Sequence, residues 1–212
     1  MSTSMQTAPV PTVFVVDDEE PVGDSIAMLL RTVGLPSRVY RDPRRFLDEY
    51  RPEQPGCLLL DVRMPQLGGL EVQEELARRN VTLPIIFITG HGDVPMAVEA
   101  MRAGALDFIQ KPFNDDELIR RVQKALEQDA RERELLGRAD EIGRRWAGLT
   151  ARERDVARRI GEGAANKVVA ADLGISVRTV ELHRARILSK VGVRSVAQLA
   201  RMLAQLGPKA HT

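Results

Sequence analysis

Residues 57–65 read CLLLDVRMP. The first four, residues 57–60, are apolar, and Asp61 follows them directly. A short apolar run of this kind is typical of a strand buried on both faces of a parallel sheet. Helical patterns lie between such runs. The clearest is the apolar face of Ile26, Leu29 and Leu30, on a helix that is predicted to end at Gly34. The other extended stretches are residues 12–16, 37–40, 85–88 and 106–109. Five strands that alternate with helices predict an α/β domain of the doubly wound, flavodoxin-like (βα)5 type.

Polar residues follow the predicted strands at the same end of each strand. Asp17 and Asp18 follow the first strand, Asp61 the third, Thr89 the fourth and Lys111 the fifth. Ligands of such sheets bind beyond the carboxyl ends of the strands, so we expect these side chains to share one cleft. Three carboxylates repel one another without a cation, and an all-oxygen site suits Mg²⁺, with Mn²⁺ as a substitute. A carboxylate, a metal, a hydroxyl and an ammonium are the groups that phosphoryl transfer requires.

Four segments carry a resemblance to a known family: VVDDEEP (15–21), LLLDVRMP (58–65), FITGHGD (87–93) and FIQKPF (108–113). In content and spacing they resemble the receiver domain of two-component response regulators over about residues 12–125. The resemblance implies that Asp61 is the phosphorylation site. It implies Mg²⁺ ligation by Asp18, Asp61 and the carbonyl of Arg63, with Asp17 acting through water.

The same resemblance implies that Thr89 is the switch hydroxyl, that Lys111 pairs with the phosphate and that Phe108 is the switch aromatic. It also implies a cis peptide bond between Lys111 and Pro112. Taken singly, each residue has a structural alternative: Thr89 as a loop cap, Lys111 as a solvated charge and Phe108 as a core residue. The four segments in order favour the receiver interpretation.

Composition sets the limits on compartment and partners. The chain of 212 residues has no run of eighteen apolar residues, so we expect no membrane-spanning segment and no membrane partner. The single Cys57 forms no internal disulfide, which is typical of a cytoplasmic protein. Residues 1–11 are rich in Ser, Thr, Gln and Pro and are predicted to be a disordered tail.

Charge is divided unevenly along the chain. Residues 1–112 hold 11 Lys or Arg and 16 Asp or Glu, a net charge of −5. Residues 148–212 hold 12 Lys or Arg and 5 Asp or Glu, a net charge of +7. The acidic front and basic rear indicate different partners, and the rear is a candidate for nucleic-acid binding.

Residues 127–147 are predicted to form a helical linker after a receiver domain at 12–126. Acidic residues precede basic ones by four positions at Glu127/Arg131 and Glu134/Arg138, the order that stabilises a helix. Leu135, Ala139, Ile142 and Trp146 form an apolar stripe at helical spacing. The linker either continues the preceding helix or contains a break, and a flexible tether remains the alternative.

Residues 148–208 are predicted to form an all-α four-helix domain. Thr150 and Glu153 match a capping box, and Asn166 matches the N-cap of a second helix that Gly174 ends. Ser176 caps a third helix, 177–191, and a fourth follows Ser195. Two helices joined by the tight turn at 173–176 predict a helix-turn-helix.

The third helix of this domain has two faces. Val180, Ile187 and Val191 face the core, whereas Leu182 is exposed beside small and charged residues, as on a major-groove surface. The basic residues can neutralise phosphates. The alternative is an ordinary helical bundle with a basic surface. The predicted DNA-binding residues are Lys167, Arg178, Thr179, Glu181, Leu182, Arg184, Ala185, Arg186 and Lys190.

A second resemblance covers about residues 148–206. LTARERDV (149–156), GAANKVVAADLGIS (163–176) and VRTVELHRARILSKVGV (177–193) resemble the helix-turn-helix of LuxR/NarL-type regulators. It implies that Glu181, Leu182 and Ala185 face bases, with Lys167 and Thr179 at the DNA backbone. Some relatives carry Lys at positions 181 and 185, so their sequence preferences are not carried over.

Together with HGDVPMAVEAM (91–101) and AGALDFIQKPF (103–113), this domain makes the chain most similar to the FixJ/StyR/TodT group of response regulators. The resemblance implies a homodimer on phosphorylation, with Val98 and Arg102 at the dimer contact. The implied partners are a sensor histidine kinase, double-stranded promoter DNA and RNA polymerase. The implied role is a transcriptional activator without catalytic residues.

Two hypotheses from other classes remain. A haloacid-dehalogenase-like phosphatase places a DxD motif after the first strand, whereas Asp17 and Asp18 are adjacent here. A DNA-binding protein that ignores phosphorylation could keep a vestigial receiver for dimerisation. The sequence identifies neither the signal, the partner kinase nor the operator, and it leaves open whether target genes are activated or repressed.

Overall fold

The computed structural model describes residues 9–90 and 94–206 and divides the chain into two compact units, 1–132 and 133–212. Most of the predicted tail at 1–11 lies outside the described residues, as does the end of the predicted 148–208 domain. The first unit contains the strands β1 (Thr12–Val16), β2 (Ser37–Tyr40), β3 (Gly56–Asp61), β4 (Ile85–Thr89) and β5 (Asp107–Gln110). Its helices are α1 (Glu20–Thr32), α2 (Pro43–Glu49), α3 (Gly69–Arg78) and α4 (Val94–Arg102), together with the first part of α5 (Asp115–Ala147).

The five strands form one parallel sheet in the order β2-β1-β3-β4-β5. In the register of β1 and β3, Val16 pairs with Leu60, so Asp17 leaves the sheet beside Asp61. Thr89 pairs with Gln110, one residue before Lys111. The pairing therefore brings the polar residues predicted from sequence to one edge, as the flavodoxin-like prediction required.

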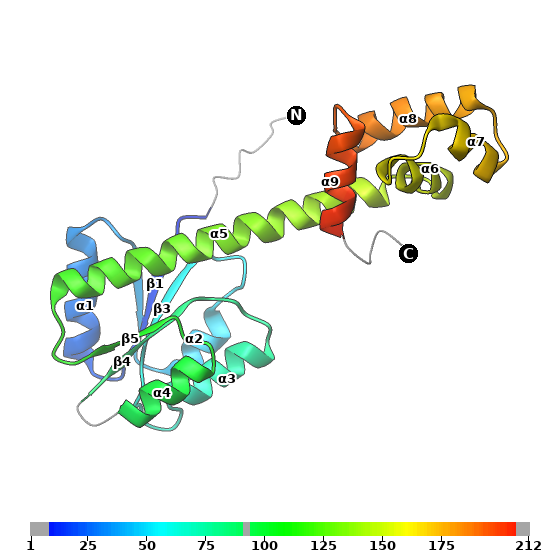
Figure 1. Ribbon diagram of the computed structural model, residues 1–212. Coiled ribbons are helices and arrows are strands. Elements are labelled where there is room, and N and C mark those ends of the chain that lie inside the picture. Colours follow the sequence, from blue (N-terminus) through cyan, green and yellow to red (C-terminus); the bar gives the residue numbers. More distant parts are fainter. Residues whose placement is uncertain (1–8, 91–93, 207–212) are drawn as a thin grey trace. The chain divides into compact units, whose positions relative to one another are not determined.

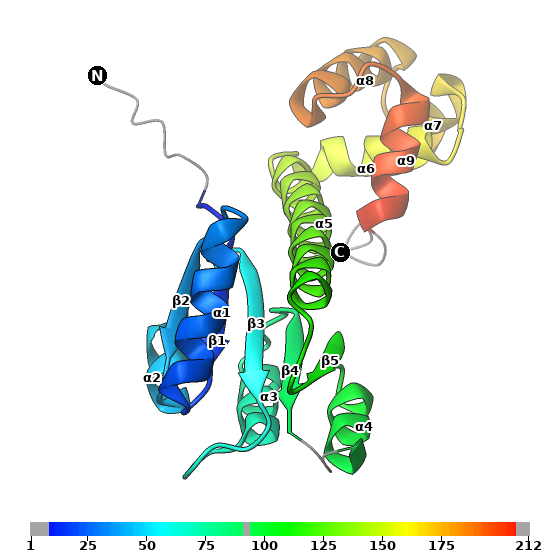
Figure 2. The same cartoon turned by 90° about the vertical axis from the view of Figure 1, so that its left-hand side faces the viewer.

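Helices cover the two faces of the sheet (Figure 1, Figure 2), and an apolar core lies on each face. One core joins strand residues such as Val15 and Leu59 to Ile26 of α1 and Leu118 of α5. The other joins Phe14 and its neighbours to α2, α3 and α4. Because both faces are buried, the strands needed contiguous apolar residues rather than an alternating pattern.

Helix α2 is an element whose residues the sequence analysis did not place. Its signals are local: the Asp42 side chain accepts a hydrogen bond from the backbone N–H of Arg44 at 2.9 Å, and Pro43 occupies the first helical position. The helix has only seven residues, too few for a clear periodic stripe.

Helix α5 contributes to each unit's own core. Leu118, Val122 and Ala125 are buried against the sheet, and Ile142 and Trp146 join the core of the second unit. Asp129 lies in the segment predicted as linker, yet it is buried and accepts a hydrogen bond from the backbone N–H of Gly56 at 2.9 Å. The helical alternative for the linker is the one observed.

The second unit contains α6 (Ala151–Gly161), α7 (Asn166–Leu173), α8 (Val177–Val191) and α9 (Val196–Leu206), drawn from yellow to red in Figure 1. The predicted capping box of Thr150 and Glu153 begins α6, Gly174 ends α7 in a left-handed conformation, and Ser176 caps α8. One prediction was wrong: Asn166 is the first residue of α7 and Ala165 precedes it as the N-cap, without a side-chain cap. The amide oxygen of Asn166 instead accepts a hydrogen bond from Arg184 of α8 at 3.4 Å.

Gly56 is a position where any side chain collides with the sheet. A Cβ there would lie 1.9 Å from the carbonyl oxygen of Thr12, whereas a Cβ at Gly137 of α5 would meet no atom within 4 Å. We expect Gly56→Ala to lower the free energy of unfolding of the first unit by at least about 2 kcal/mol. The matched Gly137→Ala should stabilise the chain by about 0.5–1 kcal/mol, because alanine favours the helix. Scanning calorimetry of both variants tests this, and equal effects would contradict it.

Candidate phosphorylation site and nucleic-acid interface

Asp17, Asp18 and Asp61 meet at the carboxyl edge of the sheet. One carboxylate oxygen from each lies within 4.8 Å of the others, and within the described residues this is the one such grouping of potential metal ligands. Asp17 and Asp61 are buried, while Asp18 is more open to solvent. Three carboxylates at this separation offer the hard oxygen ligands that Mg²⁺ prefers, so the donor set fits the cation expected from the sequence.

The ammonium of Lys111 partly offsets the charge of this cluster. Its Nζ donates to Asp17 Oδ2 at 2.8 Å and lies 3.4 Å from both Asp61 Oδ1 and Glu19 Oε1. Burial disfavours the ammonium, but the hydrogen bond to Asp17 and the carboxylate charges outweigh it and raise the pKa of Lys111. Lys111 therefore stays protonated, and its ammonium group places a positive charge beside Asp61.

The burial of Asp61 affects its protonation. Burial raises the pKa of Asp61 to about 6, the charge of Lys111 opposes this rise, and the charges of Asp17 and Asp18 add to it. A further positive charge at the cluster would favour the ionised form of Asp61. The ionised form is the one able to act as a nucleophile.

The structure brings four of the predicted site residues together and places the others around them. Thr89 is buried at the end of β4, and its carbonyl accepts the backbone N–H of Lys111 at 2.7 Å. The Lys111–Pro112 peptide bond is cis, as predicted. Arg63 is exposed two residues after Asp61. Glu19, which the sequence analysis did not single out, donates its backbone N–H to Asp17 Oδ1 at 2.9 Å.

Phe108 lies outside the carboxylate cluster, on the face formed by α4 and β5. Its side chain is 41% exposed, so the alternative of a buried core residue does not hold in this structure. Val98 and Arg102, the predicted dimer contacts, are also exposed, and Met101 lies beside them in sequence with 40% exposure. The face therefore exposes the apolar side chains of Val98, Met101 and Phe108 beside the charged Arg102.

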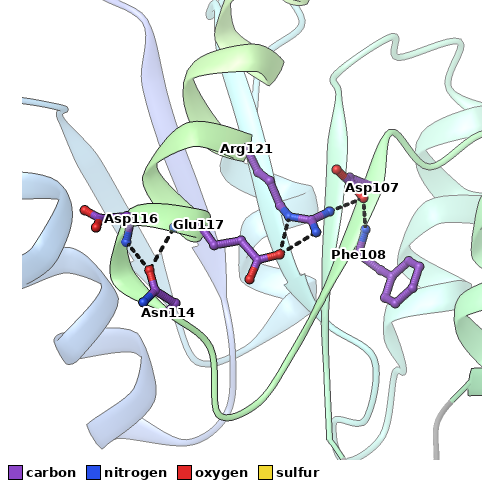
Figure 3. A network of polar contacts seen from close by, with 6 residues as sticks. All are labelled: Asp107, Phe108, Asn114, Asp116, Glu117 and Arg121. Carbon is purple, nitrogen blue, oxygen red and sulfur yellow. Dashed lines mark hydrogen bonds and ion pairs between the residues drawn. The ribbon is translucent and has the colours of Figure 1, made fainter.

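Ion pairs of Arg121 lie near Phe108, as Figure 3 shows. Arg121 of α5 pairs with Asp107 of β5 and with Glu117, the latter at 2.5 Å. The ring of Phe108 points away from Arg121 in the same view. The Arg121–Asp107 pair joins α5 to β5, whereas the Glu117 pair lies within α5.

The predicted DNA-binding residues lie on α7 and α8. Val180, Ile187 and Val191 are buried, whereas Leu182 is 56% exposed, which confirms the two faces predicted for this helix. The exposed members of the predicted set are Lys167, Arg178, Glu181, Leu182, Ala185, Arg186 and Lys190. Thr179 and Arg184 are partly buried, and the Thr179 hydroxyl lies 2.8 Å from the Ser176 hydroxyl.

Lys190 is engaged within the protein. Its Nζ donates to Glu153 Oε2 at 2.7 Å, and the same oxygen accepts the backbone N–H of Thr150 at 2.8 Å. The hydrogen bonds from Lys190 and Thr150 lower the pKa of the buried Glu153 to about 2. The pair ties the start of α6 to the end of α8, so this lysine is less free than Arg178 to reach a phosphate.

The fold and the acidic cluster define a receiver domain, and the second unit defines a helix-turn-helix domain. The response regulator receiver domain family matches residues 13–123, and the bacterial regulatory protein luxR family matches residues 147–203. The chain therefore belongs to the two-component response regulators with a LuxR-type DNA-binding domain, a family of transcriptional regulators.

Relatives of similar length share both domains. The transcriptional regulatory protein FixJ of Azorhizobium caulinodans is 44% identical over 90% of this chain and 90% of its own. Nodulation protein W of Bradyrhizobium diazoefficiens is 43% identical over 94% of this chain and 88% of its own. The solved structure of the response regulator StyR has a TM-score of 0.88 and 41% identity, over 92% of this chain and 99% of that one.

A full-length FixJ structure from B. japonicum has a TM-score of 0.58 and 36% identity, covering 94% of this chain. These matches agree with the group that the sequence resembles. Across the described residues, no helix is long and apolar enough to cross a membrane.

Glu153 makes the stability of the second unit depend on pH. Its pKa falls from a usual value of 4.5 to about 2 in the folded chain, so its contribution is complete above pH 4.5. It is lost as the pH falls through the window between these two values. We expect Glu153→Gln to lower the free energy of unfolding by about 1–3 kcal/mol at pH 7.

The difference between wild type and Glu153→Gln should shrink steadily from pH 4.5 towards pH 2. Urea unfolding followed by fluorescence of Trp146, the single tryptophan, measures it in the second unit. A difference that stays constant with pH would contradict the assignment.

Proposed function

We propose that this chain is a phosphorylation-controlled activator of transcription whose acceptor is Asp61. The observation that carries the proposal is the meeting of Asp17, Asp18, Asp61 and Lys111 at one edge of the sheet. The same chain carries a LuxR-type domain, so phosphorylation at that edge of the sheet would regulate DNA binding. A sensor histidine kinase is the donor that a receiver domain implies.

In the proposed reaction, a carboxylate oxygen of Asp61 attacks the phosphorus of a phosphohistidine. The new O–P bond forms, the P–N bond breaks and the imidazole leaves. Asp18, Asp61 and the carbonyl of Arg63 would hold Mg²⁺ or Mn²⁺, with Asp17 acting through water. When bound, the cation neutralises charge on the phosphoryl oxygens. Lys111, already 3.4 Å from Asp61, pairs with the phosphate, and the Thr89 hydroxyl donates to it.

The proposed output is a population shift between two forms of the α4–β5 face. Thr89 moves towards the phosphorylated Asp61, and Phe108, which is exposed here, turns into the space that Thr89 leaves. The changed face then pairs with a second copy through Val98 and Arg102. Dimerisation raises the effective concentration of the second DNA-binding domain at a paired site.

The proposed DNA contacts lie on α7 and α8. Glu181, Leu182 and Ala185 face bases, and Lys167, Thr179, Arg178, Arg184 and Arg186 contact the backbone. Lys190 contributes through its remaining N–H donors while it stays paired with Glu153. RNA polymerase is the expected partner of the bound dimer. Promoter DNA as target implies a cytoplasmic location.

Phosphorylation is tested by intact mass after incubation with Mg²⁺ and acetyl phosphate. We expect the wild type to gain one phosphoryl group and Asp61→Asn to gain none, because the variant lacks the nucleophile. No gain by the wild type with either acetyl phosphate or a phosphorylated kinase would favour the vestigial receiver. Continuous turnover of phosphate monoesters would favour the phosphatase hypothesis instead.

Dimerisation is tested by light scattering of the phosphorylated chain. We expect phosphorylation to shift the wild type towards a dimer and Val98→Asp to remain monomeric, because a charge would be buried in an apolar contact. Leu136→Asp is the matched control, since Leu136 is an exposed apolar residue of α5 and belongs to neither α4 nor β5. Equal loss of the dimer in both variants would contradict the proposed contact.

A further inference from the structure

The carboxyl end of the recognition helix α8 is closed by backbone hydrogen bonds that do not use its last carbonyl. Gly192 adopts a left-handed conformation, its N–H donates to Ser189 O at 3.2 Å, and the N–H of Val193 donates to Leu188 O at 2.9 Å. This pattern satisfies carbonyls one turn back from the end. The carbonyl of Val191 needs a donor from elsewhere.

Arg145, in the last turn of α5, supplies that donor. Its Nη1 donates to Val191 O at 3.1 Å, and its Nη2 pairs with Glu141 Oε1 at 2.5 Å. A Cβ added to Gly192 would lie 3.0 Å from Nη1, so the guanidinium rests against the residue that ends α8. A cation at this position also offsets the negative end of the helix dipole.

The neighbours of Arg145 make this contact a fixed one. Trp146 is 5% exposed within the core of the second unit, which sets the position of the last turn of α5. Glu141 holds the guanidinium from its own helix. The pair of Lys190 and Glu153 anchors the same end of α8 to the start of α6. A hydrogen bond from Arg145 of α5 and an ion pair with Glu153 of α6 thus hold one end of α8.

We propose that Arg145 is a positioning residue for DNA recognition, which fixes α8 to the end of the linker helix before DNA is bound. This inference rests on the proposed function, since it requires α8 to read DNA. A helix held in its binding orientation loses less conformational freedom on binding, which strengthens sequence-specific association. Arg145 itself contacts no DNA in this scheme.

The test compares Arg145→Met with Arg138→Met. Arg138 lies two turns earlier on α5 and makes the same i,i+4 pair, with Glu134 at 2.5 Å. Within the described residues it makes no hydrogen bond to α8. The control therefore removes the same charge and helix pair without touching the end of α8.

The probe is a DNA duplex that the wild type selects from a random-sequence library, with a scrambled duplex as reference. Fluorescence anisotropy at several salt concentrations gives affinity and salt slope. We expect Arg145→Met to weaken binding to the selected duplex roughly three- to tenfold, the equivalent of about one hydrogen bond. The salt slope should stay unchanged, and Arg138→Met should stay within about twofold of the wild type.

Each other outcome has a distinct meaning. A salt slope that falls by about one in Arg145→Met would show a direct phosphate contact and overturn the positioning role. Equal behaviour of the two variants would also overturn it. A wild type that selects no sequence would instead refute the proposed function, whatever the variants do.

Folding is checked separately, by thermal unfolding followed by Trp146 fluorescence. Backbone amide hydrogen exchange of the free protein should be faster at Gly192 and Val193 in Arg145→Met and unchanged in Arg138→Met. Unchanged exchange in both variants would contradict the proposal that Arg145 anchors the end of α8. If Arg145→Met fails to fold, Arg145→Lys takes its place in both assays. Lysine keeps a cationic donor, but it lacks the planar guanidinium that contacts the Val191 carbonyl and the Glu141 carboxylate together. We therefore expect an intermediate loss of affinity.

Discussion

The ammonium of Lys111 lies against Asp17 and beside Asp61, where three carboxylates crowd the carboxyl edge of a buried parallel sheet. Like charges this close destabilise the fold unless a cation stands near them. A single lysine leaves the cluster with net negative charge, so the site is built to accept further positive charge. The three carboxylates whose mutual repulsion destabilises the folded chain are also the residues proposed to hold a divalent cation.

Strands β4 and β5 lie between the carboxylate site and the α4–β5 face. Thr89 ends β4 and Phe108 lies in the adjacent, hydrogen-bonded strand β5, the path that the proposed mechanism uses between Asp61 and the α4–β5 face. Phe108 is exposed and the apolar centre of that face is uncovered, while the Arg121 ion pairs hold its border. Exposed apolar side chains beside an ion-paired edge suit the dimer contact proposed for this face.

Charged side chains organise the second unit in a different way. Its basic surface is suited to phosphates, yet several of its cations are engaged within the protein: Lys190 with Glu153, Arg184 with Asn166 and Arg145 with Val191. These contacts bind α8 to three other helices. The orientation of the recognition helix is thus set by the whole unit, including the last turn of α5.

Sequence alone determined the strand pattern, the polar residues at the strand ends, the caps of α6 and α8 and the two faces of α8, because each depends on neighbouring residues or on a short period. It did not place α2, it misassigned Asn166, and it gave no sign of the contacts of Asp129, Glu153 with Lys190, or Arg145. Those contacts join residues 73, 37 and 46 positions apart. Only the packed chain decides them, since no local pattern specifies which distant carbonyl, amide or carboxylate a side chain will meet.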